Sequence, residues 1–120
     1  MAGEKIFYVE DDEILAKVLE WRLQKLGYTI CGSAQSGPEA IAGITETKPD
    51  LVLLDIEIKG PLDGIEVGQY LADKTKIPFV YLTSHTEDSF LQRAKKTGPK
   101  GYVHKPIKGD ELRIALTLAL

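Results

Sequence analysis

Leu51-Val52-Leu53-Leu54-Asp55 places four consecutive aliphatic residues directly before a carboxylate, and Pro49-Asp50 precedes them. A short apolar run of this kind is typical of a strand that is buried on both faces of a parallel sheet. In such sheets, ligands bind at the carboxyl ends of the strands. Asp55 is therefore predicted to bind a ligand, to act as a nucleophile, or to cap the turn that follows the strand.

The composition is typical of one globular domain. The chain has 120 residues, of which 43% are hydrophobic and 28% charged, and no apolar run approaches the roughly 20 residues that span a bilayer. A formal charge of −3 argues against a general nucleic-acid binder, which is normally strongly basic. Cys31 is the only cysteine, so no internal disulfide can form and we expect a cytoplasmic protein. We predict a single domain over residues 1–120 that contacts neither a membrane nor nucleic acid directly.

Five short apolar runs are predicted to be strands, and they cover residues 5–9, 28–32, 51–55, 77–82 and 101–104. Helix start signals or helically spaced apolar residues follow each run, so helices are expected to begin near residues 12, 36, 64, 87 and 109. This alternation predicts a parallel sheet with right-handed crossovers and helices on both faces. The predicted fold is a doubly wound α/β domain.

Four acids in a row, at residues 10–13, follow the first predicted strand. One acid is enough to cap the next helix, and Asp11 or Asp12 is placed to do so. Repulsion among the other acids must be offset, and a bound divalent cation would offset it. In the helix that follows, Trp21 is predicted to pack on the protein, and the apolar residues at helical spacing are Leu15, Val18, Leu19 and Leu26.

Polar side chains stand where the predicted strands end. They are Glu10 and Asp11 after the first strand, Asp55 after the third, Thr83 after the fourth and Lys105 after the fifth. Right-handed crossovers bring all these ends to one edge of the sheet. Clustered carboxylates favour a small hard cation such as Mg²⁺, and an ammonium and a hydroxyl can hold phosphoryl oxygens. An aspartate can accept a phosphoryl group, so the set suits phosphoryl transfer.

Five segments carry a resemblance to a known family: Val9-Glu10-Asp11-Asp12, Pro49 to Asp55, Asp63-Gly64, Tyr81-Leu82-Thr83-Ser84 and Gly101 to Pro106. In this order and spacing, the chain resembles the receiver domains of two-component response regulators over essentially its whole length. The resemblance implies a flavodoxin-like fold with five parallel strands in the order 2-1-3-4-5. It also implies a phosphorelay switch in which Asp55 accepts a phosphoryl group from a histidine kinase or a histidine phosphotransfer protein.

The resemblance implies a role for the other residues of the set. Glu10 and Asp11 match the acidic pair that binds Mg²⁺, Thr83 the switch hydroxyl, Lys105 the lysine that contacts the phosphoryl group, and Tyr102 the switch aromatic residue. The bond between Lys105 and Pro106 is expected to be cis. Such a domain is not an enzyme with a separate substrate, but a phosphoacceptor that catalyses its own phosphorylation and dephosphorylation.

Two finer predictions concern the loops after the third and fourth strands. We expect Asp11 and Asp55 to bind Mg²⁺ directly, with the Glu57 backbone carbonyl as a third ligand and Glu10 acting through water. Glu57 and His85 stand two residues beyond Asp55 and Thr83, respectively. Their side chains are predicted to flank the phosphoryl group and to tune its lifetime by controlling the attack of water.

Three other functions use related chemistry or the same fold. A phosphohydrolase resembling the haloacid dehalogenases would carry Asp-x-Asp on its first strand, and this chain has no room for the usual cap domain. A flavin-binding module would need a phosphate loop where this chain has four acids. A receiver used only for contacts would usually lack a site residue, and none is missing here.

The last predicted helix is unusually apolar. One stripe of its apolar residues can pack on the sheet, but helical spacing spreads the others onto faces that need a partner, a second copy or a following segment. We therefore expect residues 1–120 to be the receiver part of a longer protein with a linked output or sensor domain, although a stand-alone switch stays open. The resemblance also leaves open a dimer through the fourth helix, the fifth strand and the last helix. The apolar residues are Leu112, Ile114, Ala115, Leu116, Leu118, Ala119 and Leu120.

Overall fold

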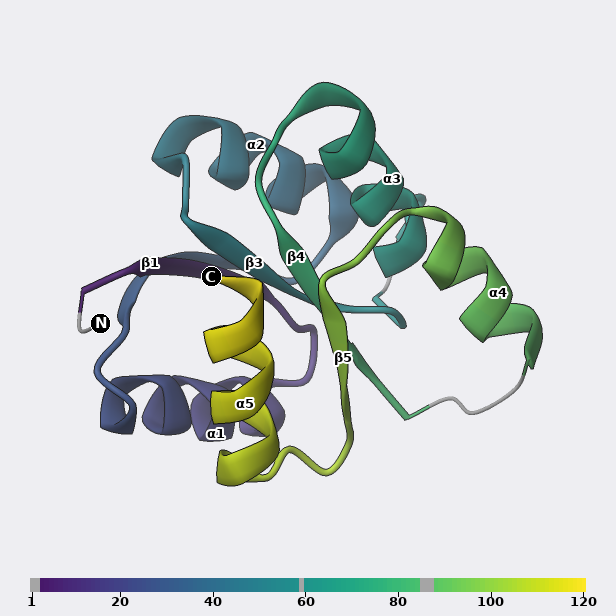
Figure 1. The fold of residues 1–120 in the computed structure, drawn as a ribbon. Coiled ribbons are helices and arrows are strands. Elements are labelled where there is room, and N and C mark those ends of the chain that lie inside the picture. Colours follow the sequence, from purple (N-terminus) through teal and green to yellow (C-terminus); the bar gives the residue numbers. More distant parts are fainter. Residues whose placement is uncertain (1–2, 59, 85–87) are drawn as a thin grey trace.

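The computed structural model describes residues 3–58, 60–84 and 88–120, which form one parallel sheet with helices on both faces (Figure 1). The strands are β1 (Lys5–Val9), β2 (Thr29–Ala34), β3 (Leu51–Asp55), β4 (Phe79–Thr83) and β5 (Gly101–His104). The helices are α1 (Glu13–Lys25), α2 (Gly37–Thr47), α3 (Gly64–Lys74), α4 (Asp88–Lys96) and α5 (Gly109–Ala119). The strand order is β2-β1-β3-β4-β5, and every neighbouring pair is parallel. The predicted doubly wound fold and strand order are therefore confirmed.

Strand β3 forms the centre of the sheet, between β1 and β4, and all five of its residues are buried. Its side chains alternate between the two faces, as in any strand. Leu51 and Leu53 pack in the core under α1 and α5, while Val52 and Leu54 pack in the core under α2, α3 and α4. Figure 1 shows this division of the five helices into two layers. Burial on both faces explains why this strand is continuously apolar.

The start of α3 lies directly against the end of β3. Asp63 caps the helix through a capping box with Glu66, in which each side chain accepts a hydrogen bond from the other residue's backbone N–H. A Cβ atom at Gly64 would stand only 1.9 Å from the carbonyl oxygen of Asp55. The loop from Asp55 to α3 can therefore turn this closely only because residue 64 has no side chain.

Helix α1 begins where it was predicted to begin, but the residues that face the core differ from those expected. Asp12 caps it by accepting hydrogen bonds from two backbone N–H groups of the first turn. Leu19 and Leu23 are its buried residues, whereas Val18 and Trp21 are exposed. The prediction that Trp21 packs on the protein was wrong, because the helix turns Trp21, like Val18, away from the sheet, while Leu19 and Leu23, four residues apart, share the inner face.

Smaller differences occur at strand ends. Strand β2 continues to Ala34, two residues beyond its predicted end, and β4 begins at Phe79 rather than Ile77. Pro78 has no N–H to donate to a neighbouring strand, which explains the later start of β4.

In the parts of the chain that the structure describes, no helix has the length and apolar character needed to cross a bilayer.

Candidate functional site

Lys105, Glu10 and Asp55 meet at the carboxyl edge of the sheet. The Lys105 ammonium nitrogen lies 3.0 Å from Oε1 of Glu10 and 3.0 Å from Oδ2 of Asp55. Glu10 and Asp55 are buried, and Lys105 is mostly buried. The predicted convergence of the ends of β1, β3 and β5 therefore occurs, with the ammonium placed between the two carboxylates.

Both oxygens of the Asp55 carboxylate have a donor. Oδ2 accepts from Lys105 at 3.0 Å, and Oδ1 accepts from the backbone N–H of Glu57 at 3.0 Å. The chain stays paired to β4 just beyond the strand, since the Ile56 N–H donates to the Leu82 carbonyl at 3.1 Å. The carboxylate is thus held in one orientation by its own loop on one side and by Lys105 on the other.

Charge in this site is only partly balanced. Burial, reinforced by the nearby Glu10, raises the pKa of Asp55 from 3.8 to about 7, while Lys105 opposes both effects. Burial alone lowers the pKa of Lys105, but its contacts with Asp55 and Glu10 raise that pKa above the usual value. One ammonium faces more than one carboxylate, so an additional cation would stabilise the ionised form of Asp55.

The acidic residues fit a hard divalent cation. Glu10, Asp11 and Asp55 can each offer one carboxylate oxygen, and these three atoms lie within 4.8 Å of one another. Carboxylate oxygens are the ligands that Mg²⁺ prefers, together with water molecules that it retains. Asp11 is partly exposed, so solvent reaches this side of the cluster.

Both oxygens of Glu10 are engaged, as those of Asp55 are. Oε1 contacts Lys105, and Oε2 accepts from the backbone N–H of Asp12 at 3.1 Å. The same Asp12 caps α1, so the loop after β1 is fixed at two points. Glu10 therefore connects the lysine to the loop that carries Asp11.

Thr83 and Tyr102 lie on neighbouring strands, β4 and β5. Thr83 is buried and pairs with His104, while Tyr102 pairs with Tyr81. The Tyr102 side chain is 41% exposed, and its ring centroid lies 6.0 Å from that of Tyr81. The Tyr102 ring is therefore exposed to solvent in this structure.

The other predictions for the site concern Glu57, His85 and the bond before Pro106. The carboxylate of Glu57 accepts a hydrogen bond from the Ser84 hydroxyl at 3.4 Å, which links the loops after β3 and β4. His85 lies outside the described residues. The bond between Lys105 and Pro106 is cis, as the resemblance implied. Ser84 had no predicted role, although a second hydroxyl directly after Thr83 was a usable signal.

Tyr81 was also missed. Its hydroxyl contacts Thr97 at the end of α4, and a Cβ atom at Gly68 of α3 would stand 2.1 Å from that hydroxyl oxygen. A second polar contact, between Arg93 of α4 and Asp63 at 3.3 Å, joins the same helices. The signal was a tyrosine inside a strand predicted to be buried, because a buried phenol needs a hydrogen-bond partner.

The response regulator receiver domain model matches residues 6–117. The chain belongs to this family. The receiver is 32% identical over 116 residues to the transcriptional regulatory protein PdtaR of Mycobacterium tuberculosis, a match that covers 97% of this chain and 56% of that protein. It therefore spans little more than half the length of this curated relative.

Solved receivers share its fold. The signal receiver domain of a modulated diguanylate cyclase from Desulfovibrio desulfuricans G20 is 35% identical with a TM-score of 0.90, over 96% of this chain and 91% of that one. The BeF3-activated N-terminal receiver domain of Klebsiella pneumoniae RstA is 31% identical with a TM-score of 0.88, over 97% of both chains. Members of the family take a phosphoryl group on an aspartate and in general bind Mg²⁺ at an acidic pocket.

Proposed function

We propose that Asp55 of this receiver accepts the phosphoryl group, from a phosphohistidine of a histidine kinase or a histidine phosphotransfer protein. An Asp55 oxygen attacks phosphorus, a P–O bond forms and the P–N bond breaks. The imidazole leaves in its neutral form when its other ring nitrogen carries a proton. The observation that carries this assignment is the buried Asp55 carboxylate at the end of β3, held by Lys105 and by the Glu57 N–H.

Magnesium would be bound by the side chains of Asp11 and Asp55 and by the Glu57 backbone carbonyl, with Glu10 acting through water. The proximity of the three carboxylates supports such a site, and the indirect role of Glu10 rests on its longer side chain. The ion supplies positive charge against the phosphoryl oxygens. Lys105 moves from its two carboxylates toward a phosphoryl oxygen, which it can hold by a charge-assisted hydrogen bond.

Thr83 and Tyr102 would form the switch. The Thr83 hydroxyl donates to the phosphoryl group, and the space that it leaves lets Tyr102 turn from exposed to buried. Two facts support this role. Leu82 of β4 pairs with Asp55, and the next residue, Thr83, is buried. Tyr102 is partly exposed on the neighbouring strand, β5. The phosphoryl group biases an equilibrium between two states of one domain.

Glu57 and His85 would tune the lifetime of the phosphoryl group by controlling the attack of water. The hydrogen bond of Glu57 with Ser84 supports a position of its carboxylate over the site edge. Replacing either residue by alanine should change the dephosphorylation rate without abolishing phosphorylation. Unchanged lifetimes in both variants would contradict this assignment.

We infer that this switch belongs to a longer protein and forms a dimer. Residues 1–120 would be the receiver part of a longer cytoplasmic protein, with a linked output or sensor domain and no direct contact with nucleic acid or membrane. A relative of nearly twice the length supports the linked domain, and the charge of −3 argues against nucleic-acid binding. The dimer would form through the face that α4, β5 and α5 make together.

The deciding experiment needs no partner protein. The chain is incubated with a small acyl phosphate and Mg²⁺, and its intact mass and modified residue are determined by mass spectrometry. One phosphoryl group on Asp55 is expected, with no gain in EDTA. Asp55→Asn should gain none, while Asp73→Asn, on the exposed side of α3, should behave as the unmodified chain. Equal labelling of Asp55→Asn would overturn the proposal.

A further inference from the structure

Helices α2 and α3 both end at the amino edge of the sheet, from which β3 and β4 begin (Figure 1). A hollow of about 390 Å³, lined by residues within 44–49 and 70–77, lies between these helix ends, and we call it the α2–α3 hollow. Its volume is within the range of pockets that hold small organic molecules. Asp55 lies at the opposite edge of the sheet, so the hollow is separate from the acidic site.

The floor of the α2–α3 hollow is apolar. Ile44 and Pro49 are buried there, and Tyr70 and Ile77 are half-buried with part of their side chains packed on the core. An apolar floor of this kind binds the hydrophobic body of a ligand, and a few polar groups at the rim then fix its orientation.

Two ammonium groups supply the polar rim. Lys48 caps the end of α2, Lys74 lies in the last turn of α3, and both side chains are exposed. Neither forms an ion pair with another described residue, and no acid is among the described residues that line the hollow. The hydroxyls of Thr45 and Thr75 donate to helix carbonyls instead, at 2.7 Å each. The rim therefore attracts an anion.

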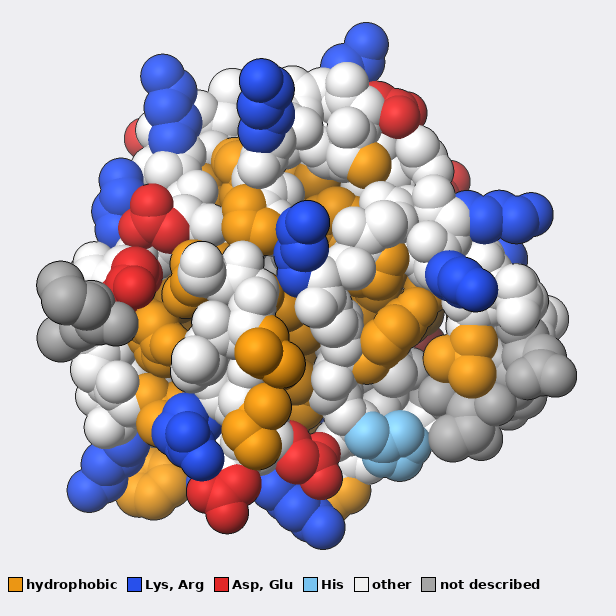
Figure 2. All heavy atoms as spheres, in the orientation of Figure 1, with side chains coloured by type: hydrophobic (Ala, Val, Ile, Leu, Met, Phe, Trp, Pro, Cys, Tyr) orange, Lys and Arg blue, Asp and Glu red, His pale blue; other side chains and the backbone are white. Residues whose placement is uncertain are grey.

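The outer surface shows the same arrangement. In Figure 2, Lys and Arg side chains project along the upper edge of the molecule, where α2 and α3 end in Figure 1, and hydrophobic side chains lie below them. Positive charge of this kind raises the local concentration of anions.

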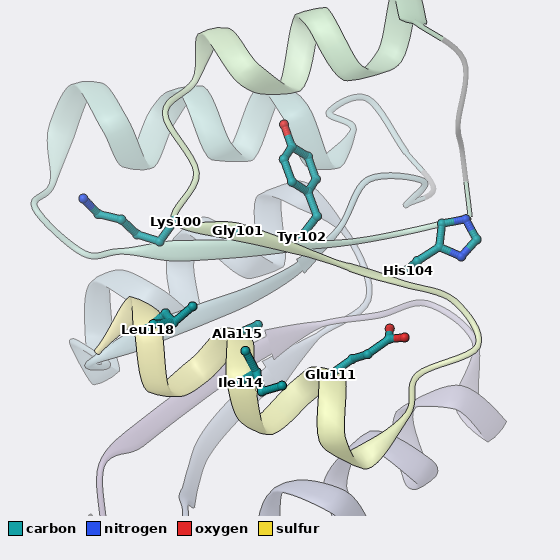
Figure 3. A pocket seen from close by; sticks show the side chains of 8 residues that line it. All are labelled: Lys100, Gly101, Tyr102, His104, Glu111, Ile114, Ala115 and Leu118. Atoms are coloured by element: carbon teal, nitrogen blue, oxygen red, sulfur yellow. The ribbon is translucent and has the colours of Figure 1, made fainter.

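A second hollow, of about 420 Å³, lies between β5 and α5 and has a different character (Figure 3). Its lining carries charges of both signs, with Lys100 and Leu118 at one end and Glu111 and His104 at the other. Leu118 is 80% exposed, so this wall is largely open to solvent. The groove between β5 and α5 therefore favours neither an anion nor a cation, whereas the α2–α3 hollow favours an anion.

The backbone at Lys48 allows the ammonium to be removed without disturbing the turn. Its φ of 48° is the only positive φ of a non-glycine residue in the described part of the chain. Glycine or asparagine adopts this left-handed conformation at lower cost than lysine. The turn itself does not need the lysine, so Lys48→Asn should preserve the fold.

We propose that the α2–α3 hollow binds a small organic acid. The aromatic or branched apolar body of the acid packs on Ile44, Tyr70 and Ile77. Its carboxylate lies at the rim, where the ammonium groups of Lys48 and Lys74 bind it by charge-assisted hydrogen bonds. The acid and a phosphoryl group on Asp55 can be bound at the same time, because the two sites lie at opposite edges of the sheet.

The probe that tests this site is naphthoate, a planar aromatic carboxylate. It is compared with naphthalenemethanol, which is neutral, and naphthalenemethylamine, which is cationic. Each compound is titrated into the isotope-labelled chain without phosphoryl donor, and the amide signals are followed by NMR. Naphthoate should give saturable shifts at Thr45, Thr75 and Ile77, and should bind roughly four- to twentyfold more tightly than the alcohol if both ion pairs form. The amine should bind most weakly.

Lysine variants test the rim. Lys48→Asn and Lys74→Gln should each weaken the binding of naphthoate by roughly two- to fivefold, and the double variant should bind it no more tightly than the alcohol. The matched control is the double variant Lys17→Gln and Lys25→Gln, which removes two exposed lysines of α1 on the other face of the sheet. This control should bind naphthoate as the unmodified chain does.

Four results would overturn the proposal. They are no saturable binding of naphthoate up to millimolar concentration, shifts spread over surfaces away from the hollow, equal affinity for naphthoate and the alcohol, and equal loss of affinity in the rim and control double variants. Because no phosphoryl donor is present, such a failure is distinct from a failure of Asp55 labelling.

Discussion

The hydroxyl of Tyr81 lies 2.6 Å from Oγ1 of Thr97, and both residues are buried. Thr97 donates its own proton to the Ala94 carbonyl at 2.6 Å, so Tyr81 is the donor to Thr97. The ring of Tyr81 also contacts that of Tyr102, with 6.0 Å between centroids. Burial raises the pKa of Tyr81 to about 12, so the phenol stays protonated at neutral pH. One side chain of β4 therefore joins the end of α4 to the predicted switch residue of β5.

The hydrogen bond between Tyr81 and Thr97 predicts that two conservative variants lose different amounts of unfolding free energy. Tyr81→Phe removes the donor and leaves Thr97 bonded to Ala94, so the free energy of unfolding should fall by only about 1 kcal/mol. Thr97→Val leaves the Tyr81 hydroxyl buried without an acceptor, which should cost about 1–3 kcal/mol. Urea unfolding measures both, and adding Tyr81→Phe to Thr97→Val should recover part of the loss. A larger cost for Tyr81→Phe than for Thr97→Val would contradict the assignment of donor and acceptor.

The raised pKa of Asp55 predicts how stability depends on pH without metal. Between pH 3.8 and about 7 the carboxyl is protonated in the folded chain and ionised in the unfolded chain. The folded state then binds more protons, so the free energy of unfolding falls as pH rises through this window. Asp55→Asn removes this loss and should be more stable than the unmodified chain at pH 8 in EDTA, by at most about 4 kcal/mol.

Urea unfolding at pH 3.5 and pH 8 checks this expectation. The advantage of Asp55→Asn should nearly disappear at the lower pH, where Asp55 is mostly protonated in both states. Magnesium should reduce the advantage at pH 8, because the ion binds the carboxylate and not the amide. Asp73→Asn provides the control, and a less stable Asp55→Asn variant at pH 8 would show that Lys105 outweighs burial and Glu10.

Metal affinity tests the acidic cluster directly. Asp11→Ala should weaken Mg²⁺ binding by roughly tenfold or more, since even residues that only support metal ligands contribute that much. Phosphorylation by a small acyl phosphate should fall in parallel. Calorimetric titration measures the affinity, and Asp73→Ala serves as the control. If Asp11→Ala bound Mg²⁺ as tightly as the unmodified chain, the ligand set would have to be reassigned.

Gly64, the first residue of α3, should not tolerate a side chain. In Gly64→Ala the new Cβ would meet the Asp55 carbonyl oxygen, so α3 or the end of β3 must move. We expect a loss of about 3 kcal/mol or more in unfolding free energy and slower phosphorylation, because the moved backbone carries Asp55. Gly101→Ala is the control, since a Cβ there meets nothing within 4 Å. Equal stability of the two variants would contradict the close approach.

Much of the fold was predictable because its signals are local. The uninterrupted apolar run at residues 51–54 indicated a strand buried on both faces, and the alternation of strands and helices left one topology class. The convergence of Glu10, Asp55 and Lys105 then followed from the direction of parallel strands. Their 3.0 Å contacts could not be predicted, since these depend on how each loop leaves the sheet.

The wrong or missed predictions concern α1 and β4, where the sequence pattern is compatible with more than one packing arrangement. On α1 apolar residues occupy both faces, so periodicity did not distinguish the buried Leu23 from the exposed Val18 and Trp21. The partner of Tyr81 lies sixteen residues away on another element, and no local signal in the sequence pairs them. Side-chain contacts between elements depend on packing, which a pattern of apolar positions does not specify.

The close approach of Gly68 to the Tyr81 hydroxyl has a consequence for how this sequence can change over time. Any side chain at position 68 would collide with the tyrosine oxygen, and a tyrosine at position 81 fits only because position 68 is empty. If the substitution Tyr81→Phe came first, it would remove that oxygen and leave a Cβ at position 68 with ring contacts of 3.0 Å to residue 81 and 3.1 Å to Phe79, which small shifts of the rings can relieve, whereas the reverse order would pass through a clash at 2.1 Å. The two positions are therefore expected to vary together among descendants of this chain, with the change at 81 coming first.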